Sequence, residues 1–329
     1  MTDLLTLGET MVSVRTARPM RLGGDAHLSI AGSESNVAIG AARLGHDVTW
    51  LSAVGNDEPG RLIQRTLRAE NVQTRMRFSD GAFTGFIAFD QPSHDITRVS
   101  YHRRGSAAST LTPDETSAAV TALEPSLLHV TGITPALSDT ARAATLAAVR
   151  TAGSNCQVSL DVNYRGRLWS RASAAIALRE LLPHIHTVFA SDDELDLLTD
   201  AADPIAALLK TVNTVVVTAG SKGAWTHTTA PTPHTPAPRA HEPAAQDPAE
   251  VQTVHRPALP VTVVDSIGAG DAFVSGYLSA TLDGLSPEAR LDRATTSGAF
   301  CVTAYGDWES LPTRDDLTLL THTQGTALR

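Results

Sequence analysis

Short apolar runs alternate with longer amphipathic segments through the middle of the chain, and this alternation limits the fold more than any other feature. Four of the runs have the length and composition of buried strands: 127–133, 157–163, 187–191 and 214–220. Helical patterns follow the first two from Ser138 and from near Ser170, and serine is a favoured helix cap. Such alternation predicts an α/β fold, a mostly parallel sheet with helices on both faces. Ligands bind such sheets beyond the carboxyl ends of the strands.

Three other segments depart from this pattern. Residues 10–33 and about 73–104 contain short strand-like runs separated by turns, which predict a small antiparallel accessory sheet. Residues 227–257 are rich in Pro and Ala without apolar periodicity, so we expect an exposed loop or flexible insertion. The irregularly spaced histidines of this insertion give little basis for a metal site. We expect a single domain over residues 1–329.

The composition argues against several classes of protein. The net charge is -9 and there is no basic run, so nucleic acid is not an expected partner. No apolar run reaches the roughly 18 residues of a membrane span, and the first residues do not have the pattern of a signal peptide. Cys156 and Cys301 stand far apart in apolar surroundings, as expected for buried free thiols in a reducing compartment. These features predict a soluble, cytoplasmic protein.

The stretch "VDSIGAGDAFVSGYL" places a glycine-rich turn between an expected strand, 261–264, and an expected helix. Gly268 and Gly270 permit close approach of the backbone, and bared amides at a helix start bind anions. Asp271 then fits a general base beside a phosphoryl group. The alternative is an aspartate that simply caps the helix. These residues alone leave both interpretations open.

The sequence contains neither the glycine–lysine P-loop motif nor a dinucleotide fingerprint. The chain has only two lysines, Lys210 and Lys222. The charge of a bound phosphate must therefore be met mainly by backbone amides, arginine and metal.

The glycine turn resembles the C-terminal signature of the ribokinase-like, or PfkB, family of carbohydrate kinases. "AGSESNVAIGAARLG" (31–45) resembles the N-terminal signature, and "GNDEPG" (55–60) and "TAGSKGAW" (218–225) resemble family segments in the expected order. The resemblance covers nearly the whole chain apart from the insertion. It implies a ribokinase-like fold, a lid formed by the segments 10–33 and 73–104, and ATP-dependent phosphorylation of a sugar hydroxyl.

Within this family the chain resembles 2-keto-3-deoxygluconate kinases in "YHRRGSAAS" (101–109), "GITPALS" (132–138) and "SLDVNYRGRLWS" (159–170). This implies transfer to the 6-hydroxyl of the sugar acid, giving its 6-phosphate. A sugar acid needs a fixed cation, and the planar fork of arginine suits a carboxylate. Arg103 and Arg165 match the substrate-binding arginines of that branch.

The resemblance also implies the other site residues. Asp271 would be the catalytic base, with Gly268, Ala269 and Gly270 as the anion hole. The sugar would be bound by Gly32, Asn36, Tyr101, Arg103, Ile133, Arg165, Asp271 and Asp307. ATP would be bound by Ser191, Thr218, Gly220, Ser221, Gly223, Gly268 and Gly270. Glu194 would organise Mg²⁺ through water, with the Mg²⁺ accompanying ATP. A monovalent-cation site near Asp265 is left open.

Several alternatives stay open at this stage. Ile87 stands where that branch has a tyrosine, and Ser191 replaces the asparagine of the family's N-x-x-E segment, which puts fine specificity in doubt. A kinase of a neutral sugar such as fructose or ribose is the nearest rival, and a non-catalytic sugar sensor on the same fold is another. The sequence does not separate gluconate from galactonate epimers. We expect a homo-oligomer that pairs through the lid.

Overall fold

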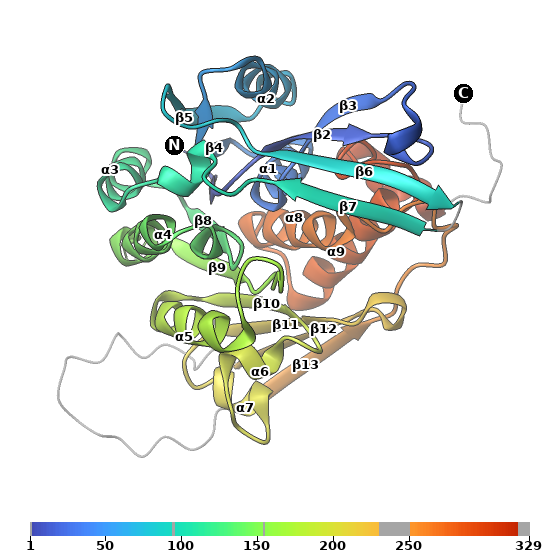
Figure 1. Ribbon diagram of the computed structural model, residues 1–329. Coiled ribbons are helices and arrows are strands. Elements are labelled where there is room, and N and C mark those ends of the chain that lie inside the picture. Colours follow the sequence, from blue (N-terminus) through green and yellow to red (C-terminus); the bar gives the residue numbers. More distant parts are fainter. Residues whose placement is uncertain (1, 94–95, 154, 230–250, 322–329) are drawn as a thin grey trace.

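The computed structural model describes residues 2–93, 96–153, 155–229 and 251–321, and within these residues the chain forms two sheets (Figure 1). The larger sheet has nine strands in the order β13-β12-β11-β10-β9-β8-β1-β4-β5. All neighbours from β5 to β11 pair in parallel, whereas β12 and β13 are antiparallel. The strands are β1 (Leu4–Leu7), β4 (Val48–Gly55), β5 (Gln73–Ser79), β8 (Leu127–Thr131), β9 (Gln157–Asp161), β10 (Thr187–Ser191), β11 (Thr214–Thr218), β12 (Ala224–Thr229) and β13 (Val251–Arg256).

Helices cover both faces of this sheet because side chains alternate between the faces along each strand. In β1, Leu5 belongs to the core packed on α3, α4 and α5, whereas Leu4 belongs to the core packed on α1, α2, α8 and α9. The α-helices are α1 (Ser33–Arg43), α2 (Glu58–Ala69), α3 (Pro113–Leu123), α4 (Asp139–Thr151), α5 (Arg171–Leu181), α6 (Leu195–Leu198), α7 (Pro204–Leu208), α8 (Ala269–Leu282) and α9 (Pro287–Cys301). Short 3₁₀ helices are η1 (Met20–Leu22), η2 (Ala107–Thr110), η3 (Thr134–Ala136), η4 (Leu182–His184), η5 (Gly220–Lys222) and η6 (Asp315–Thr321).

The four strands expected from the apolar runs are confirmed as β8, β9, β10 and β11. The cap expected at Ser138 is present, and Ser170 also caps its helix. Ser138 Oγ accepts a hydrogen bond from the Ala141 amide at 2.9 Å, and Ser170 Oγ accepts one from the Ser173 amide at 3.1 Å. The α/β fold with helices on both faces is therefore the predicted one.

The small sheet has the order β3-β2-β6-β7, from β2 (Met11–Arg15), β3 (His27–Ala31), β6 (Phe86–Ser93) and β7 (Ile96–His102). In Figure 1 its strands β6 and β7 pass in front of α1 and α8. The two segments predicted for this lid do meet, but two details of the prediction are wrong. The second segment is too wide, because β5 pairs with β4 in the large sheet. The small sheet is mixed rather than antiparallel, because β2 and β6 pair in parallel.

Two further boundaries differ from the sequence prediction. Residues 261–264 do not form a strand, and Val263 is 63% exposed. The segment 227–257 is not a single loop, because its two ends belong to β12 and β13, where Thr229 pairs with Val251. Residues 230–250 lie outside the described residues.

Cys156 and Cys301 are buried free thiols, as predicted. In the described part of the chain, no helix combines the length and the apolar character needed to cross a membrane.

Candidate active site

A cavity of about 450 Å³ lies where the carboxyl ends of β9, β10 and β11 face the small sheet. All the residues predicted to bind the sugar line it: Gly32, Asn36, Tyr101, Arg103, Ile133, Arg165, Asp271 and Asp307. Five of the residues predicted for the nucleotide or its metal also line it: Ser191, Glu194, Thr218, Gly268 and Gly270. Four predicted residues are outside its lining: Ala269, Gly220, Ser221 and Gly223.

Asp271 lies in the first turn of α8, and its carboxylate is held by α1 rather than by its own helix. Oδ1 accepts a hydrogen bond from Ser33 Oγ at 2.6 Å, and Oδ2 accepts one from Asn36 Nδ2 at 2.8 Å. The N-cap residue of α8 is Gly268, and no side chain caps this helix. Asp271 therefore does not act as the plain cap that the sequence left open. Burial raises the pKa of Asp271, and the hydrogen bonds from Ser33 and Asn36 oppose that rise.

The glycine turn presents backbone to the cavity. Gly268 has φ +80°, a left-handed conformation that favours glycine. A Cβ at Gly270 would meet no atom within 4 Å, so the space beside the second glycine is open. Amides at the start of α8, together with the helix dipole, form a favourable place for an anion.

Two polar residues that we did not predict from the sequence, Asp161 and Asn163, join this network. Asn163 Nδ2 donates to Ser33 Oγ at 2.9 Å and to Asp161 Oδ2 at 3.2 Å. Burial raises the pKa of Asp161 well above its ordinary value, and the charges of Glu194 and Asp271 raise it further. Both residues could have been found, because they stand two positions apart at the carboxyl end of a predicted strand.

Glu194 is fixed at the cavity wall by two backbone amides. Oε1 accepts a hydrogen bond from the Tyr164 amide at 2.7 Å, and Oε2 accepts one from the Ser191 amide at 2.9 Å. The Ser191 hydroxyl is directed elsewhere, since it donates to Asp193 Oδ1 at 2.6 Å. The Ser191 amide therefore orients Glu194 even though its side chain is not an amide.

The carboxylates of Asp161, Glu194 and Asp271 face one cavity and supply the oxygen donors that Mg²⁺ prefers. Across the described ranges, no group of three acidic, His or Cys side chains converges closely enough to hold a metal alone. These residues therefore fit Mg²⁺ that is held through water and through the phosphates of a nucleotide, with Glu194 oriented to receive such a water.

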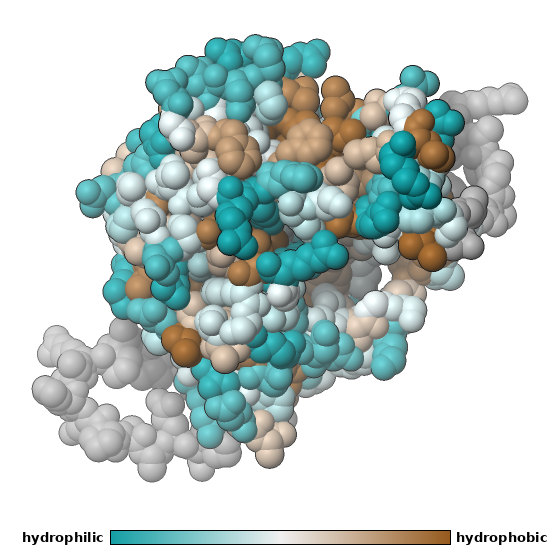
Figure 2. Space-filling model, viewed as in Figure 1, coloured by the Kyte–Doolittle hydropathy of each residue, from teal (hydrophilic) through white to brown (hydrophobic). Residues whose placement is uncertain are grey.

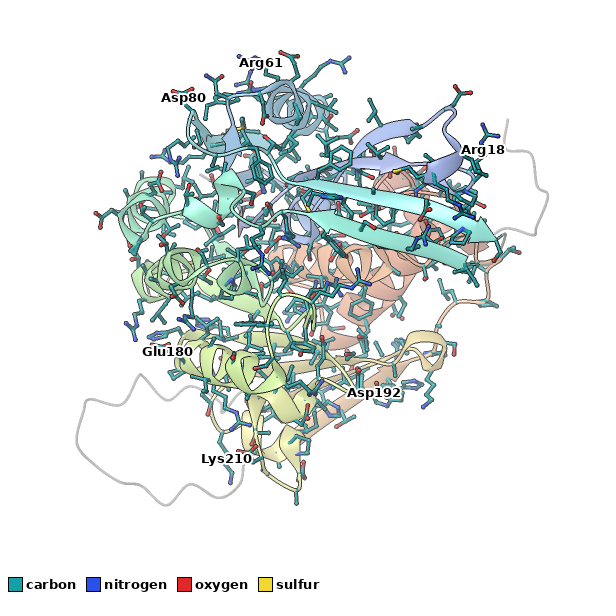
Figure 3. All side chains as sticks on the ribbon, in the orientation of Figure 1. Arg18, Arg61, Asp80, Glu180, Asp192 and Lys210 are labelled. Carbon is teal, nitrogen blue, oxygen red and sulfur yellow. The ribbon has the colours of Figure 1, made fainter. Side chains whose placement is uncertain are left out.

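The expected nucleotide side begins at Thr218, the last residue of β11. The next residues form η5, and Gly223 closes this turn with φ +91°. Lys210 and the exposed Asp192 are labelled in Figure 3, which shows Lys210 at the edge of the molecule beside α7, far from the small sheet. Lys210 therefore offers no charge to a phosphate in the cavity, as the low lysine content suggested.

The two predicted arginines have different surroundings. Arg103 is 8% exposed, and its Nε lies 2.6 Å from Oε2 of the buried Glu9, which also accepts a hydrogen bond from Ser106. Arg165 is exposed at the cavity wall, and its side chain forms no ion pair or hydrogen bond with the described residues. Its charge lowers the pKa of Asp271, and both residues line the cavity. Arg165 is therefore the more available cation for an anionic ligand.

The remaining predicted sugar contacts form the rest of the wall. Asp307 is buried, and burial raises its pKa to about 7, with the charge of Asp271 adding to the rise. Ile133 is 6% exposed and contributes apolar surface. Ile87 lines the cavity in the place expected for a tyrosine. A Cβ at Gly32 would lie 2.4 Å from the carbonyl oxygen of Glu9, so this glycine is required for close packing.

A parallel α/β sheet, an acid beside an anion-binding glycine turn, and a second sheet over the cavity together define the class of lidded small-molecule kinases. The model of the pfkB family carbohydrate kinases matches residues 1–314. The chain belongs to this family and is a phosphotransferase with an alcohol group as acceptor.

Individual proteins agree with this assignment. The chain is 34% identical over 330 residues to the 2-dehydro-3-deoxygluconokinase of Bacillus subtilis, covering 96% of this chain and 94% of that protein. It is 31% identical over 315 residues to the 2-dehydro-3-deoxygalactonokinase of Haloferax volcanii, covering 93% and 92%. A putative ribokinase II from E. coli, solved with ATP and Mg²⁺, has the same fold with a TM-score of 0.83 at 21% identity, covering 98% and 99%.

Proposed function

We propose that this protein transfers the terminal phosphoryl group of Mg-ATP to the 6-hydroxyl of 2-keto-3-deoxygluconate, giving 2-keto-3-deoxy-6-phosphogluconate. The observation that carries the proposal is the placement of Asp271. Its carboxylate stands at the amide-lined start of α8, in one cavity with Arg165 and Arg103. A base, an anion site and a cation for a sugar carboxylate are thus within reach of one small ligand.

In this mechanism the sugar hydroxyl attacks phosphorus while its proton passes to Asp271. The bond from phosphorus to the ADP oxygen breaks, so ADP leaves with the electron pair and no covalent enzyme intermediate is needed. The amides of Gly268 and Gly270, which line the cavity, stabilise the phosphoryl oxygens as charge develops on them, whereas the Ala269 amide donates to the Ser266 carbonyl at 3.4 Å and would have to turn to join them. Ser33 and Asn36 keep the carboxylate oriented toward the cavity. Mg²⁺, with its waters held by Glu194, would neutralise charge on the phosphates.

The sugar would lie between the small sheet and α1. Arg165 supplies the free positive charge for its carboxylate, while Arg103, already paired with Glu9, supplies N–H donors more than net charge. Tyr101 and Ile87 form the lid side of the pocket, and Asp307 and Asn36 supply polar contacts. Exclusion of water by the lid favours transfer to the sugar over hydrolysis of ATP.

One observation favours the rival, a kinase of a neutral sugar such as fructose. Because Glu9 neutralises Arg103, the cavity has less net positive charge than the two arginines alone indicate. A panel of ADP-release assays separates the two. We expect kcat/KM to be highest for 2-keto-3-deoxygluconate or its galactonate epimer, and a preference for fructose or ribose would contradict the proposal.

The decisive variant is Asp271→Asn, which keeps the shape of the side chain and removes the base. We expect kcat to fall by about 10²–10⁴-fold, while sugar binding measured by calorimetry is retained. Asp192→Asn is the control, since Asp192 is an exposed acid that does not line the cavity. Near-normal turnover in Asp271→Asn would refute the mechanism, and sugar binding by the wild-type protein without ADP release would instead indicate a sensor.

We further infer a cytoplasmic homo-oligomer that pairs through the small sheet. Leu28 of β3 and Ile96 of β7, on the two edge strands of the small sheet, are 60% and 58% exposed and offer apolar surface to a second copy of the chain. Figure 2 shows hydrophobic residues gathered between α2 and the small sheet. Light scattering should give more than one chain per particle, and Leu28→Glu should shift the mass toward one chain.

A further inference from the structure

The side chain of Arg15 extends from the small sheet and places its positive charge beside two carboxylates next to the glycine turn. It is the last residue of β2, and Nη1 lies 2.9 Å from Asp265 Oδ2 while Nη2 lies 3.8 Å from Asp307 Oδ1. The guanidinium lies over the ring of Phe89 on β6, with 4.5 Å from Cζ to the ring centroid. The side chains of Arg15 and Asp265 are 15% and 9% exposed, so solvent and salt screen their attraction only weakly.

Asp265 and Asp307, whose carboxylates face Arg15, contact the glycine turn from two sides, Asp265 through its carboxylate and Asp307 through its backbone. Asp265 Oδ1 accepts a hydrogen bond from the Ile267 amide at 3.1 Å, which fixes the approach to the turn. The backbone of Asp307 packs directly against Gly268. A charge that holds the Asp265 carboxylate therefore helps to order the turn whose amides face the cavity, and its attraction for Asp307 adds to this order.

The surroundings of this ion pair are otherwise acidic. Burial raises the pKa of the Cys301 thiol to about 12, and the negative charges of four nearby carboxylates contribute to this rise: Asp271, Asp307, Asp265 and Glu309. Within the described ranges, Arg15 is the side chain that forms ion pairs with Asp265 and Asp307. A concentration of negative charge beside a phosphate site requires a nearby cation, because the carboxylates would otherwise repel the phosphates.

We propose that Arg15 takes the place of a monovalent cation beside Asp265, so that the enzyme orders its glycine turn without K⁺ or Na⁺. One oxygen of Asp265 accepts a hydrogen bond from the Ile267 amide; the other has no hydrogen-bond partner among the described residues but forms an ion pair with the Arg15 guanidinium at 2.9 Å. The residues present therefore do not fit a bound monovalent ion at this position, since the guanidinium would repel it. Arg15 does not line the main cavity, so it is a positioning residue, and its role rests on the proposed kinase function.

The test compares wild-type protein with Arg15→Met, which keeps the length of the side chain and removes the charge. Arg98→Met is the matched control, because Arg98 also belongs to the small sheet and pairs with Asp90 at 2.7 Å, away from the glycine turn. Each protein is measured in KCl, NaCl and tetramethylammonium chloride at one ionic strength of about 0.1 M. Two readouts are taken, the Tm without substrates and ADP release with the sugar acid.

We expect the wild-type protein and Arg98→Met to give the same Tm and the same rate in all three salts. Arg15→Met should lose about tenfold or more in kcat in tetramethylammonium. KCl should restore part of this rate and raise the Tm of Arg15→Met alone. A wild-type enzyme that K⁺ stimulates, or an Arg15→Met variant that responds to salt as the control does, would overturn the inference. The Tm comparison holds even if no sugar acid is a substrate, so failure of the proposed function would be seen separately.

Discussion

Gly268 and the carbonyl of Asp307 are in such close contact that a Cβ built on Gly268 would lie 2.2 Å from the carbonyl oxygen. The φ of Gly268, +80°, adds a second restriction on any other residue. The turn that begins α8 therefore depends on this glycine for both space and backbone conformation.

We expect Gly268→Ala to lower the free energy of unfolding by about 1–3 kcal/mol and kcat by up to about 10²-fold, because the turn must shift. Gly270→Ala is the matched control for stability alone, since a Cβ there meets no atom within 4 Å but Gly270 belongs to the proposed anion site. Urea unfolding and ADP release measure the two effects. If both alanine variants retain the wild-type stability, the close contact does not determine the turn.

Arg165→Gln should raise KM for the sugar acid by about 10–100-fold, because an interaction with a charged partner is worth about 1.5–3 kcal/mol. A neutral sugar, if it is turned over at all, should be affected much less. Arg167→Gln is the control, since Arg167 donates to the Val99 carbonyl of the small sheet at 3.0 Å and does not line the cavity. An equal change for acidic and neutral sugars in Arg165→Gln would show that Arg165 does not recognise the carboxylate.

The ion pair of Arg103 and Glu9 is nearly dry, with side chains 8% and 1% exposed. Arg103→Met should destabilise the protein by about 3–5 kcal/mol, because it leaves a buried carboxylate without its partner. The double variant that also carries Glu9→Gln should recover much of this loss, since the uncharged amide could still accept a hydrogen bond from Ser106. A double variant no more stable than Arg103→Met would contradict this explanation. Chemical unfolding at neutral pH provides the comparison.

Glu34 gives a pH-dependent prediction. Burial raises its pKa from 4.5 to about 6, although Thr131 and Thr134 donate hydrogen bonds to Oε1 at 2.6 and 2.7 Å. Because the folded protein binds this proton more tightly than the unfolded chain, the stabilisation is present below pH 4.5 and is lost as the pH rises through about 6. This loss amounts to about 2 kcal/mol.

Glu34→Gln cannot ionise, so its free energy of unfolding relative to wild type should increase by up to about 2 kcal/mol between about pH 4 and about pH 8. Glu58→Gln, at a side chain that is 90% exposed on α2, serves as the control. A pH-independent difference between Glu34→Gln and wild type would contradict the prediction.

The sequence predicted where the strands lie along the chain better than it predicted which strands pair with one another. The strands β8 to β11 and the turn at Gly268 were visible because apolar runs and glycines are local signals. β5 was also visible as a strand, but the sheet that it joins depends on pairing with β4, which a local pattern does not contain. Residues 261–264 show the reverse error, since their β-branched side chains have no neighbouring strand to pair with and stay largely exposed.

The candidate site shows the same division. The cavity contains all eight predicted sugar contacts, yet the pairing of Arg103 with Glu9, 94 positions apart, was not foreseen. Nor was the pairing of Arg15 with Asp265. The residue types at the strand ends can be read directly from the sequence. Which distant side chains pair with them depends on how the two sheets pack together.

The pairing of Thr229 with Val251 also marks a practical attachment point. Because β12 runs antiparallel to β11, Ala224 lies opposite Thr218 at the cavity end, and Thr228 lies opposite Thr214 at the other end. Chain inserted between β12 and β13 would start after Thr229 and end before Val251, and both residues lie at the end of the strands away from the cavity. A reporter domain or affinity tag inserted there should leave turnover intact. Its entropic cost should be small, because the pairing of β12 with β13 already holds its two attachment points together.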